Sequence, residues 1–276
     1  MAYLFRILGC GSSGGVPRID GDWGTCDPQE PKNRRRRCSL LVRKMQTNPP
    51  QKDEASGREA VTTVLIDTAP DLREQLIDAQ ANYIDAVLYT HDHADQTHGI
   101  DDLRPLFYRH KRRIPVWMDE ATATSIMKRF AYCFRQMTES QYPAILEENR
   151  ITPDLQPIEI DGAGGRIEAK AFFQNHGRIH SLGYRIDGLI YSPDINGLPQ
   201  ESYAIFENAA LWIVDALRPV PHPTHFHLAQ TLAMIKELNV KQAVLTNLHI
   251  DMDYRTLAKE LPDHVVPAYD GMEIKL

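Results

Sequence analysis

The sequence predicts an α/β fold in which two sheets pack face to face and helices cover their outer faces, a four-layer αββα sandwich. Three observations support this prediction. Strand-like and helix-like segments alternate between residues 61 and 134, and a run of short strand candidates follows. From residue 200 onward helix and strand alternate again, so the two halves of the chain are alike. No low-complexity linker separates the halves, and we expect one domain over residues 1–276.

The first half of the chain is expected to form one sheet and its covering helices. Apolar and β-branched runs predict strands at residues 3–8, 61–67, 84–90 and 114–118. Apolar side chains at helical spacing predict helices at residues 70–80, 100–108 and 120–134. The glycine-rich turn at residues 9–15 could approach a ligand or simply connect two strands, since it matches no phosphate-binding fingerprint. Polar residues 47–59 are expected to form a mobile hairpin loop.

The second half is expected to form the other sheet. Short apolar runs predict strands at residues 157–160, 166–174, 182–186, 189–192, 211–215 and 242–246. Helices are predicted at residues 200–207 and 228–238.

Composition and charge narrow the class of protein. The net charge of -6 argues against extended nucleic acid as a partner, although residues 34–37 are four consecutive arginines. Such a run is usually a solvated edge, but if it is extended, Arg35 and Arg37 share a face and could hold an anionic substrate. The four cysteines form no C-x-x-C pair and are expected to be reduced. No signal peptide or bilayer-length apolar run is present, so we expect a cytoplasmic protein with no membrane contact.

Residues 90–99 contain three histidines and two aspartates directly after an apolar strand. A single histidine at such a position is usually a surface residue. Here His91, His93 and Asp95 are spaced by two residues, so an extended backbone points all three to the same side. Imidazoles and carboxylates are the ligands of first-row divalent metals. This segment therefore predicts a metal site at a strand end.

Further ligands and substrate-binding groups have to come from other strand ends. His176 and Asp194 each follow a predicted strand, although either residue alone would more often belong to a turn. His222 and His225 precede the predicted helix at 228–238, where they could bind a phosphate or a leaving oxygen, or merely cap the helix. His249 follows the strand at 242–246 and should lie at the same edge.

With these residues in place, the chain resembles the metallo-β-lactamase superfamily, whose His-x-His-x-Asp-His motif is nearly complete at residues 91–96. Within the superfamily it is similar to the phosphodiesterases that open phosphoribosyl 1,2-cyclic phosphate. The similarity extends in order over almost the whole chain. It includes Leu8-Gly9 with Gly11, Gly15-Val16-Pro17, Leu65-Ile66-Asp67, Asn175-His176, Ser192 with Asp194, Gly197-Leu198-Pro199, Asp215, His225, Leu245-Thr246 and Asp270-Gly271-Met272-Glu273-Ile274.

The resemblance implies an αββα sandwich of the metallo-β-lactamase type with a metal pair at one edge. The ligands implied for the first metal are His91, His93, His176 and Asp194. Those implied for the second metal are Asp95, Gln96, Asp194 and Asn247. At Gln96 and Asn247 the family has histidines. A carboxamide oxygen is a hard, neutral ligand that binds metals more weakly than imidazole does.

Three interpretations of the second position remain open: a weak site for a hard metal, a single-metal enzyme, or a rebuilt site. In a rebuilt site His98 and His249, each two residues beyond a missing histidine, would supply the lost ligands. We expect a second metal, manganese or zinc, with Asp95 and His249 among its ligands. The phosphodiesterase relatives also hold a structural zinc on clustered cysteines, but only Cys26 lies in that region, so we expect none here.

The resemblance implies a metal-dependent hydrolase of phosphodiesters, and its simplest substrate is a cyclic phosphate on a ribose or nucleotide. Asp95 would orient or deprotonate the attacking water, and His225 would protonate the leaving oxygen or bind the phosphate, with His222 as a second candidate. Alternatives are an RNA 3′-end processing nuclease, a thioester hydrolase, and a nucleotide-binding protein with little hydrolysis. The expected partner is a small phosphorylated sugar or nucleotide, and a homodimer is left open.

Overall fold

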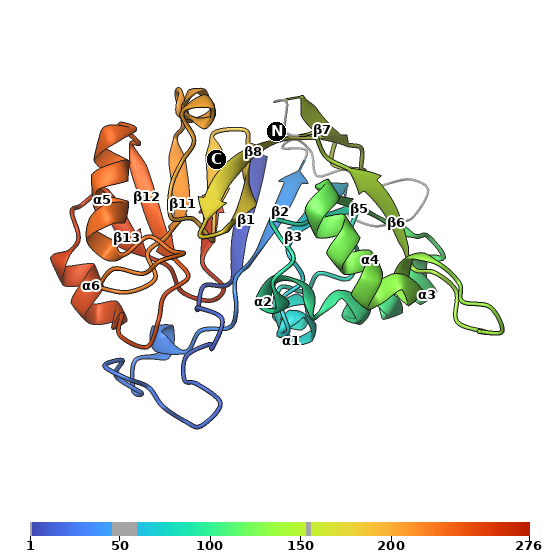
Figure 1. Cartoon of the computed structure of the whole chain (residues 1–276), viewed down its shortest axis with the longest axis horizontal. Helices are drawn as coiled ribbons and strands as arrows, with labels where there is room; N and C mark the ends of the chain where they lie inside the picture. The colour runs from blue at the N-terminus through green and yellow to red at the C-terminus, as the bar shows by residue number, and fades with distance from the viewer. Residues whose placement is uncertain (1, 46–59, 153–155) are drawn as a thin grey trace.

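Two seven-stranded sheets lie face to face at the centre of the protein, and helices cover the outer face of each sheet (Figure 1). This computed structural model describes residues 2–45, 60–152 and 156–276. The first sheet contains strands from both ends of the chain, whereas the second contains strands from its second half. The predicted four-layer αββα sandwich is confirmed.

The first sheet combines antiparallel and parallel pairs. In spatial order its strands are β14 (Glu273–Lys275), β1 (Ala2–Gly9), β2 (Ser39–Met45), β3 (Val61–Ile66), β4 (Ala86–Leu88), β5 (Ile114–Met118) and β6 (Leu146–Arg150). The pairs from β14 to β3 are antiparallel and those from β3 to β6 are parallel. Pairing of β14 with β1 places Phe5 opposite Ile274, so the two ends of the chain lie in one sheet.

The second sheet also combines antiparallel and parallel pairs. In spatial order its strands are β13 (Val265–Pro267), β12 (Gln242–Thr246), β11 (Leu211–Asp215), β10 (Leu189–Ser192), β9 (Ile179–Ile186), β8 (Ile167–His176) and β7 (Pro157–Ile160). The strands from β7 to β10 pair antiparallel, and those from β10 to β13 pair parallel.

Helices complete the outer layers. The α-helices are α1 (Leu72–Asp78), α2 (Ala94–Thr97), α3 (Arg104–His110), α4 (Glu120–Phe134), α5 (Leu228–Glu237) and α6 (Tyr254–Glu260). Short 3-10 segments are η1 (Pro31–Asn33), η2 (Ile100–Leu103) and η3 (Gln200–Phe206). One buried cluster fills the space between the sheets, a second lies under α1 and α4, and a third lies under α5 and α6.

Strand β11 illustrates how these layers arise from sequence. Leu211 and Ile213 belong to the cluster between the sheets, whereas Trp212 and Val214 belong to the cluster under α5 and α6. Successive side chains of a strand point to opposite faces, and a parallel strand covered on both faces is apolar throughout. The buried Trp212 satisfies its one donor by bonding Ser192 Oγ through Nε1 at 3.0 Å. The continuous apolar run in the sequence is thus a strand buried on both sides.

Two predicted helices differ from the structure. The segment 100–108 is divided into η2 and α3, because Pro105 has no amide hydrogen and fits only the first turn of an α-helix. The segment 200–207 is the 3-10 segment η3, since so short a stretch gains little from helical hydrogen bonds alone. Strands β6, β13 and β14 and helix α6 are short and were not predicted. The predicted hairpin loop at 47–59 lies outside the described residues.

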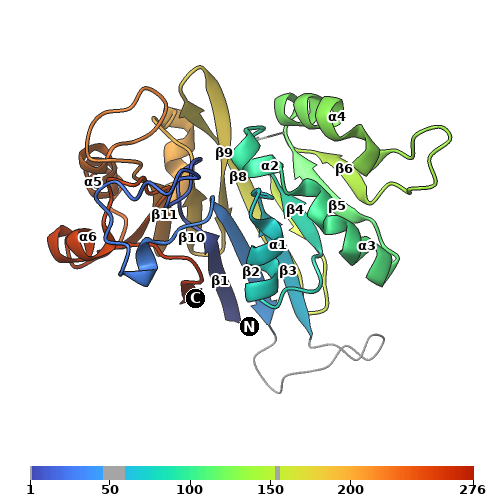
Figure 2. The same ribbon diagram turned by 90° about the horizontal axis from the view of Figure 1, so that it is seen from below.

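One edge of the sandwich gathers the loops that follow the parallel strands of both sheets. His91 lies three residues beyond the end of β4, Asp194 lies two beyond β10, Asp215 ends β11, and Asn247 directly follows β12. The hairpin between β8 and β9 adds His176. Figure 2 views this edge, with α2 next to β8 and β9. Because the carboxyl ends of parallel strands meet at one edge, residues distant in sequence are brought together there.

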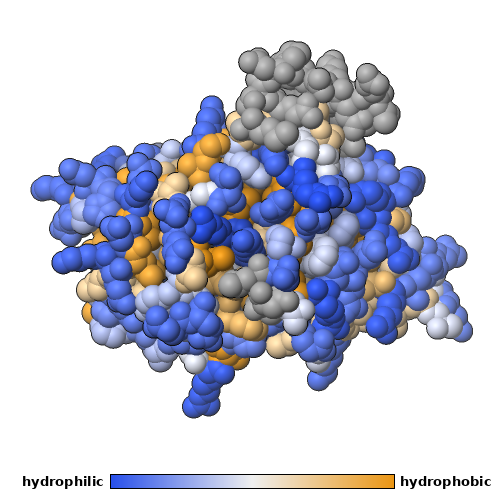
Figure 3. Space-filling model, turned by 90° about the horizontal axis from the view of Figure 1, so that it is seen from above, coloured by the Kyte–Doolittle hydropathy of each residue, from blue (hydrophilic) through white to orange (hydrophobic). Residues whose placement is uncertain are grey.

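The opposite end of the sandwich, viewed in Figure 3, carries mostly hydrophilic side chains. A hollow of about 910 Å³ there is lined by residues of both charges, with Arg6 paired to Glu273 at 3.1 Å. No histidine lines this hollow. A smaller pocket of about 340 Å³ lies at the histidine-bearing edge, and the chemistry of its residues makes it the candidate site.

Candidate metal centre

Three histidines from two segments of the chain, the connection between β4 and α2 and the end of β8, form a triangle of rings. The ring centroids of His91 and His93 are 4.5 Å apart, and each lies 5.0 Å from the ring centroid of His176. Nδ1 of His93 lies 3.3 Å from Nε2 of His176. Nε2 of His91 is buried and has no hydrogen-bond partner among the described residues. One nitrogen of each ring lies within 4.8 Å of the other two, so three lone pairs converge on one point.

Hydrogen bonds on the outer side of the triangle hold two of the rings in place. Nδ1 of His176 donates to the carbonyl oxygen of Thr224 at 2.8 Å, which leaves its Nε2 free as a ligand. Nδ1 of His91 lies 3.0 Å from Oγ1 of Thr90. Thr90 in turn donates to Asp67 through its amide at 2.8 Å and its hydroxyl at 2.9 Å. Such partners orient metal-binding imidazoles and fix their tautomers.

The electrostatic setting keeps the imidazoles of His91 and His176 neutral. Burial, reinforced by the neighbouring histidines, lowers the pKa of His91 well below its usual value. Burial also lowers the pKa of His176 to about 3. Neutral imidazole is the form that binds metal. Three converging imidazole nitrogens, one of them buried without a partner among the described residues, fit a divalent cation of the zinc or manganese type.

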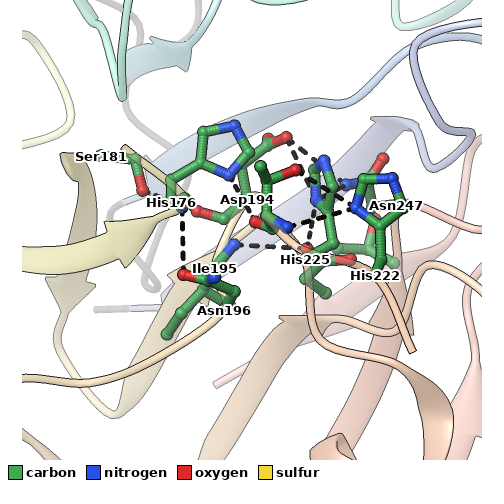
Figure 4. Close-up of polar contacts among 12 residues, drawn as sticks. His176, Ser181, Asp194, Ile195, Asn196, His222, His225 and Asn247 are labelled. Atoms are coloured by element: carbon green, nitrogen blue, oxygen red, sulfur yellow. Dashed lines mark hydrogen bonds and ion pairs between the residues drawn. The ribbon is translucent and has the colours of Figure 1, made fainter. Parts of the chain in front are cut away.

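Asp194 contacts two carboxamides. Nδ2 of Asn247 lies 3.4 Å from its Oδ1 (Figure 4). Nε2 of Gln96 donates to its Oδ2 at 3.0 Å. Asn247 has a φ of 60°, a left-handed conformation that asparagine tolerates. Asp194 is buried, and this burial raises the pKa of its carboxyl well above the usual value. Each carboxylate oxygen therefore has an amide donor.

His225 is held by a second buried carboxylate. Its Nδ1 donates to Oδ2 of Asp215 at 2.7 Å and lies 3.8 Å from Oδ1 of Asp194. Burial disfavours a charge on His225, but Asp215 outweighs it and raises the pKa of the imidazole to about 9. Burial raises the pKa of Asp215 to about 6. Near neutral pH the pair is therefore an imidazolium and a carboxylate.

The 340 Å³ pocket opens beside His225 and is rich in positive charge. Its lining consists of Ser12, Ser13, Gly14, Arg18, Asp95, Leu217, Arg218, His222, His225, Asn247 and His249. Asp95 is the one carboxylate in this lining. Arg218 donates to the carbonyl oxygens of Val220 and Pro221 at 3.3 and 2.8 Å. Among the described residues neither arginine of the lining is paired with a carboxylate, so the pocket suits an anionic ligand.

His249 belongs to the pocket wall and does not face the metal triangle. Its Nδ1 donates to Oδ2 of Asp251 at 2.8 Å, and its Nε2 accepts a hydrogen bond from Arg18. His98 is exposed and packs against the ring of Phe130, with 5.8 Å between centroids. Both nitrogens of His249 are already engaged, and His98 lies on the outer face of its turn. The expectation that these two histidines rebuild the second metal site is therefore not met.

The consecutive arginines also lie elsewhere than expected. Arg35 is buried and donates to Oδ1 of Asn33 at 3.1 Å and to the carbonyl of Met252 at 2.7 Å. Nε of Arg37 forms an ion pair with Asp71 at 3.0 Å, and Arg37 does not line the pocket. The expectation that the two side chains hold a substrate together is not met, because protein carbonyl and carboxylate groups already occupy them.

Several residues of the site were missed in the sequence. Arg18 and Arg218 lie in irregular loops and carry no periodic signal, so their convergence is a product of tertiary structure. The glycine-rich turn contributes Ser12, Ser13 and Gly14 to the pocket lining. The four cysteines are buried and unpaired, in agreement with the expected reduced thiols.

Known proteins share the fold of this chain. The model of the beta-lactamase superfamily domain matches residues 62–250. A crystal structure described as a new diphosphatase from the PhnP family is 30% identical, covers 100% of this chain and 98% of that chain, and has a TM-score of 0.83. The short form of human tRNase Z is 18% identical with a TM-score of 0.62 and 98% of each chain covered, a similarity of fold alone.

A curated relative matches almost the whole chain. An octanoyltransferase of Porphyromonas gingivalis is 29% identical over 272 residues, which are 97% of this chain and 50% of the relative. The chain thus spans half the length of the curated relative that it matches.

Two general properties follow for the chain itself. None of the helices in the described ranges is long and apolar enough to cross a bilayer. The histidine cluster could hold a metal ion within a fold of the beta-lactamase superfamily. The chain belongs to the beta-lactamase superfamily and, within it, to the PhnP family.

Proposed function

We propose that the chain hydrolyses a phosphodiester in a small phosphorylated sugar or nucleotide, most simply a five-membered cyclic phosphate on a ribose. The observation that carries this proposal is the pocket beside the histidine triangle, where Arg18 and Arg218 have no carboxylate partner in the described part of the chain. A volume of about 340 Å³ suits a small anion better than a polymer. The 30%-identical relative is described as a diphosphatase, which also favours a phosphate-containing substrate.

His91, His93 and His176 would hold the metal, with Asp194 beside them. A bound divalent metal supplies Lewis acidity, which acidifies water and neutralises charge on phosphoryl oxygens. Asp95 lines the pocket next to this centre and would accept the proton of the attacking water.

His225 is the candidate proton donor to the leaving oxygen. Asp215 holds its Nδ1 at 2.7 Å, which leaves Nε2 for the substrate, and the raised pKa keeps the ring protonated at neutral pH. His222 is the second candidate, because its ring lies 5.1 Å from that of His225 in the same lining. Arg18, Arg218 and the turn at Ser12 and Ser13 would bind the phosphate oxygens.

The hydrolysis of a diphosphate linkage is a second candidate function, favoured by the description of that relative. Hydrolysis of a phosphodiester and hydrolysis of a diphosphate linkage both need stabilisation of the charge on the phosphoryl oxygens. The two reactions differ in the leaving group. A protein that binds nucleotides without turnover is the non-enzymatic alternative.

The test is a substrate panel with protein supplemented with zinc or manganese. The panel contains a ribose cyclic phosphate, a 2′,3′-cyclic nucleotide, a linear diester, a dinucleoside diphosphate and a thioester. We expect turnover of a cyclic diester that is lost in His91→Ala. Turnover of the diphosphate alone would favour the second candidate. Tight nucleotide binding without any turnover by fully metallated protein would contradict the enzymatic proposal.

A further inference from the structure

We propose that the chain holds a single tightly bound divalent metal ion, and that Gln96 and Asn247 replace the second ion by hydrogen bonding to Asp194. The inference rests on the proposed metal-dependent function but not on the identity of the substrate. It differs from the metal pair that the family resemblance implies, and it follows from how the residues around Asp194 are engaged.

The first step concerns Asp194, which a second ion would need as a ligand. In the structure the two carboxamides that contact Asp194 present their NH₂ groups to its carboxyl oxygens. Gln96 donates to Oδ2 at 3.0 Å, and Asn247 contacts Oδ1 at 3.4 Å. The amide oxygens consequently point away from Asp194. A cation at this position would meet amide NH₂ groups instead of the lone pairs of amide oxygens.

The second step concerns the histidines. Two groups of side chains could hold an ion: His91, His93 and His176 form one, and His176, Asp194 and His225 form the other. His176 belongs to both groups. Its Nδ1 is engaged by the carbonyl of Thr224 at 2.8 Å, so only Nε2 can bind a metal, and one nitrogen lone pair serves one ion. The two groups are therefore alternatives.

The third step concerns the side chains that could replace the lost ligands. His225 donates through Nδ1 to Asp215, His249 is bonded on both nitrogens, and His98 packs on Phe130. Asp95 remains as a carboxylate in the pocket lining. One carboxylate with weak, neutral amide oxygens makes a poor site compared with three imidazoles. A second ion should consequently bind far more weakly than the first.

The test is a count of bound metal. Purified full-length protein is equilibrated with excess zinc or manganese, desalted and analysed by elemental mass spectrometry. We expect one metal per chain, and close to none in His91→Ala. The manganese-loaded protein should give the electron paramagnetic resonance spectrum of isolated ions. Two ions per chain, or an exchange-coupled spectrum, would overturn the inference and leave the proposed function standing. The absence of bound metal from the native protein would overturn both the single-metal inference and the proposed function.

A gain-of-site variant sharpens the test. Gln96→His with Asn247→His returns two imidazoles to the second position and should raise the count to two per chain. The matched control is Gln242→His, which adds an imidazole at the exposed start of β12, the strand that Asn247 follows, and should leave the count at one. His98→Ala and His249→Ala should also leave it at one. A lower metal count in His98→Ala or His249→Ala would overturn the inference. The count in the native protein decides the question even where the Gln96→His, Asn247→His double variant does not fold.

Discussion

Nδ1 of His225 donates a hydrogen bond of 2.7 Å to Oδ2 of Asp215, a carboxylate whose side chain has no exposed surface. The amide of Ile195 donates to the same oxygen at 3.2 Å. The contact joins the end of β11 to the loop before α5 and aims the free nitrogen of His225 toward the pocket. A buried ion pair of this kind orients an imidazole and stabilises its protonated form.

The first prediction concerns this pair. His225→Ala should lower turnover of a cyclic phosphodiester by about 10²- to 10⁴-fold, because a positioned proton donor contributes that much. Asp215→Asn should also lower turnover, since it weakens the orientation of the ring and removes the charge that raises its pKa. Steady-state kinetics and elemental analysis are measured together. Loss of metal in His225→Ala would mean that His225 is a ligand and not a proton donor.

The second prediction concerns the residue behind His91. Thr90→Val keeps the shape of the side chain but removes the hydroxyl that lies 3.0 Å from Nδ1 of His91. Metal affinity, measured by competition with a chelator, should fall by about 10- to 100-fold. Thr62→Val is the control, since it removes a buried hydroxyl bonded to Gly165 at the far end of β3. Equal affinities of the two variants would contradict an orienting role for Thr90.

The third prediction concerns the cationic wall of the pocket. Arg18→Gln and Arg218→Gln should each lower kcat/KM by about 10- to 100-fold, because a hydrogen bond to a charged group contributes about 1.5–3 kcal/mol. Metal content should stay unchanged. Arg73→Gln, on the exposed face of α1, is the matched control. If both pocket variants kept the kcat/KM of the control, these arginines would not bind the substrate.

The fourth prediction is a pH dependence of stability at Asp253, the N-cap of α6. Burial opposes its charge, but hydrogen bonds from Thr256, Asn33 and the amide of Asp27 outweigh it and lower the pKa to about 2. Because the pKa of the folded state is depressed, the stabilisation is complete above about pH 4 and disappears as the pH falls toward 2. Its size is about 1 kcal/mol once solvent screening is allowed for.

The corresponding measurement is urea unfolding of the native protein and Asp253→Asn between pH 2.5 and 6. The difference in unfolding free energy should be largest at pH 6 and should shrink at the acid end. A constant difference over the whole range would show that the carboxylate charge does not contribute.

Local sequence patterns already determined much of this protein. Strands such as β11 are apolar throughout because they are buried on both faces, and α4 shows an apolar stripe because one face is buried. These patterns predict the sandwich. The spacing of His91 and His93 likewise predicts a metal site, since both residues lie in one short segment whose backbone sets their direction.

Short elements without a pattern were not predictable. Strand β6 reads Leu-Glu-Glu-Asn-Arg and pairs with its neighbour β5, where Val116 lies opposite Glu148. The start of α3 depended on a single proline. Such segments take their conformation from long-range pairing that local propensity does not encode.

Tertiary structure alone decided the directions of side chains in irregular loops. The sequence left open whether His98 and His249 replace the missing ligands, and the folded chain turns them toward Phe130, Arg18 and Asp251. The folded chain also places Gln96 and Asn247 beside the two carboxyl oxygens of Asp194, although 150 residues lie between them in the sequence. The physical reason is that a buried polar group takes whichever partner the packed fold brings within reach, and that partner is usually distant in sequence.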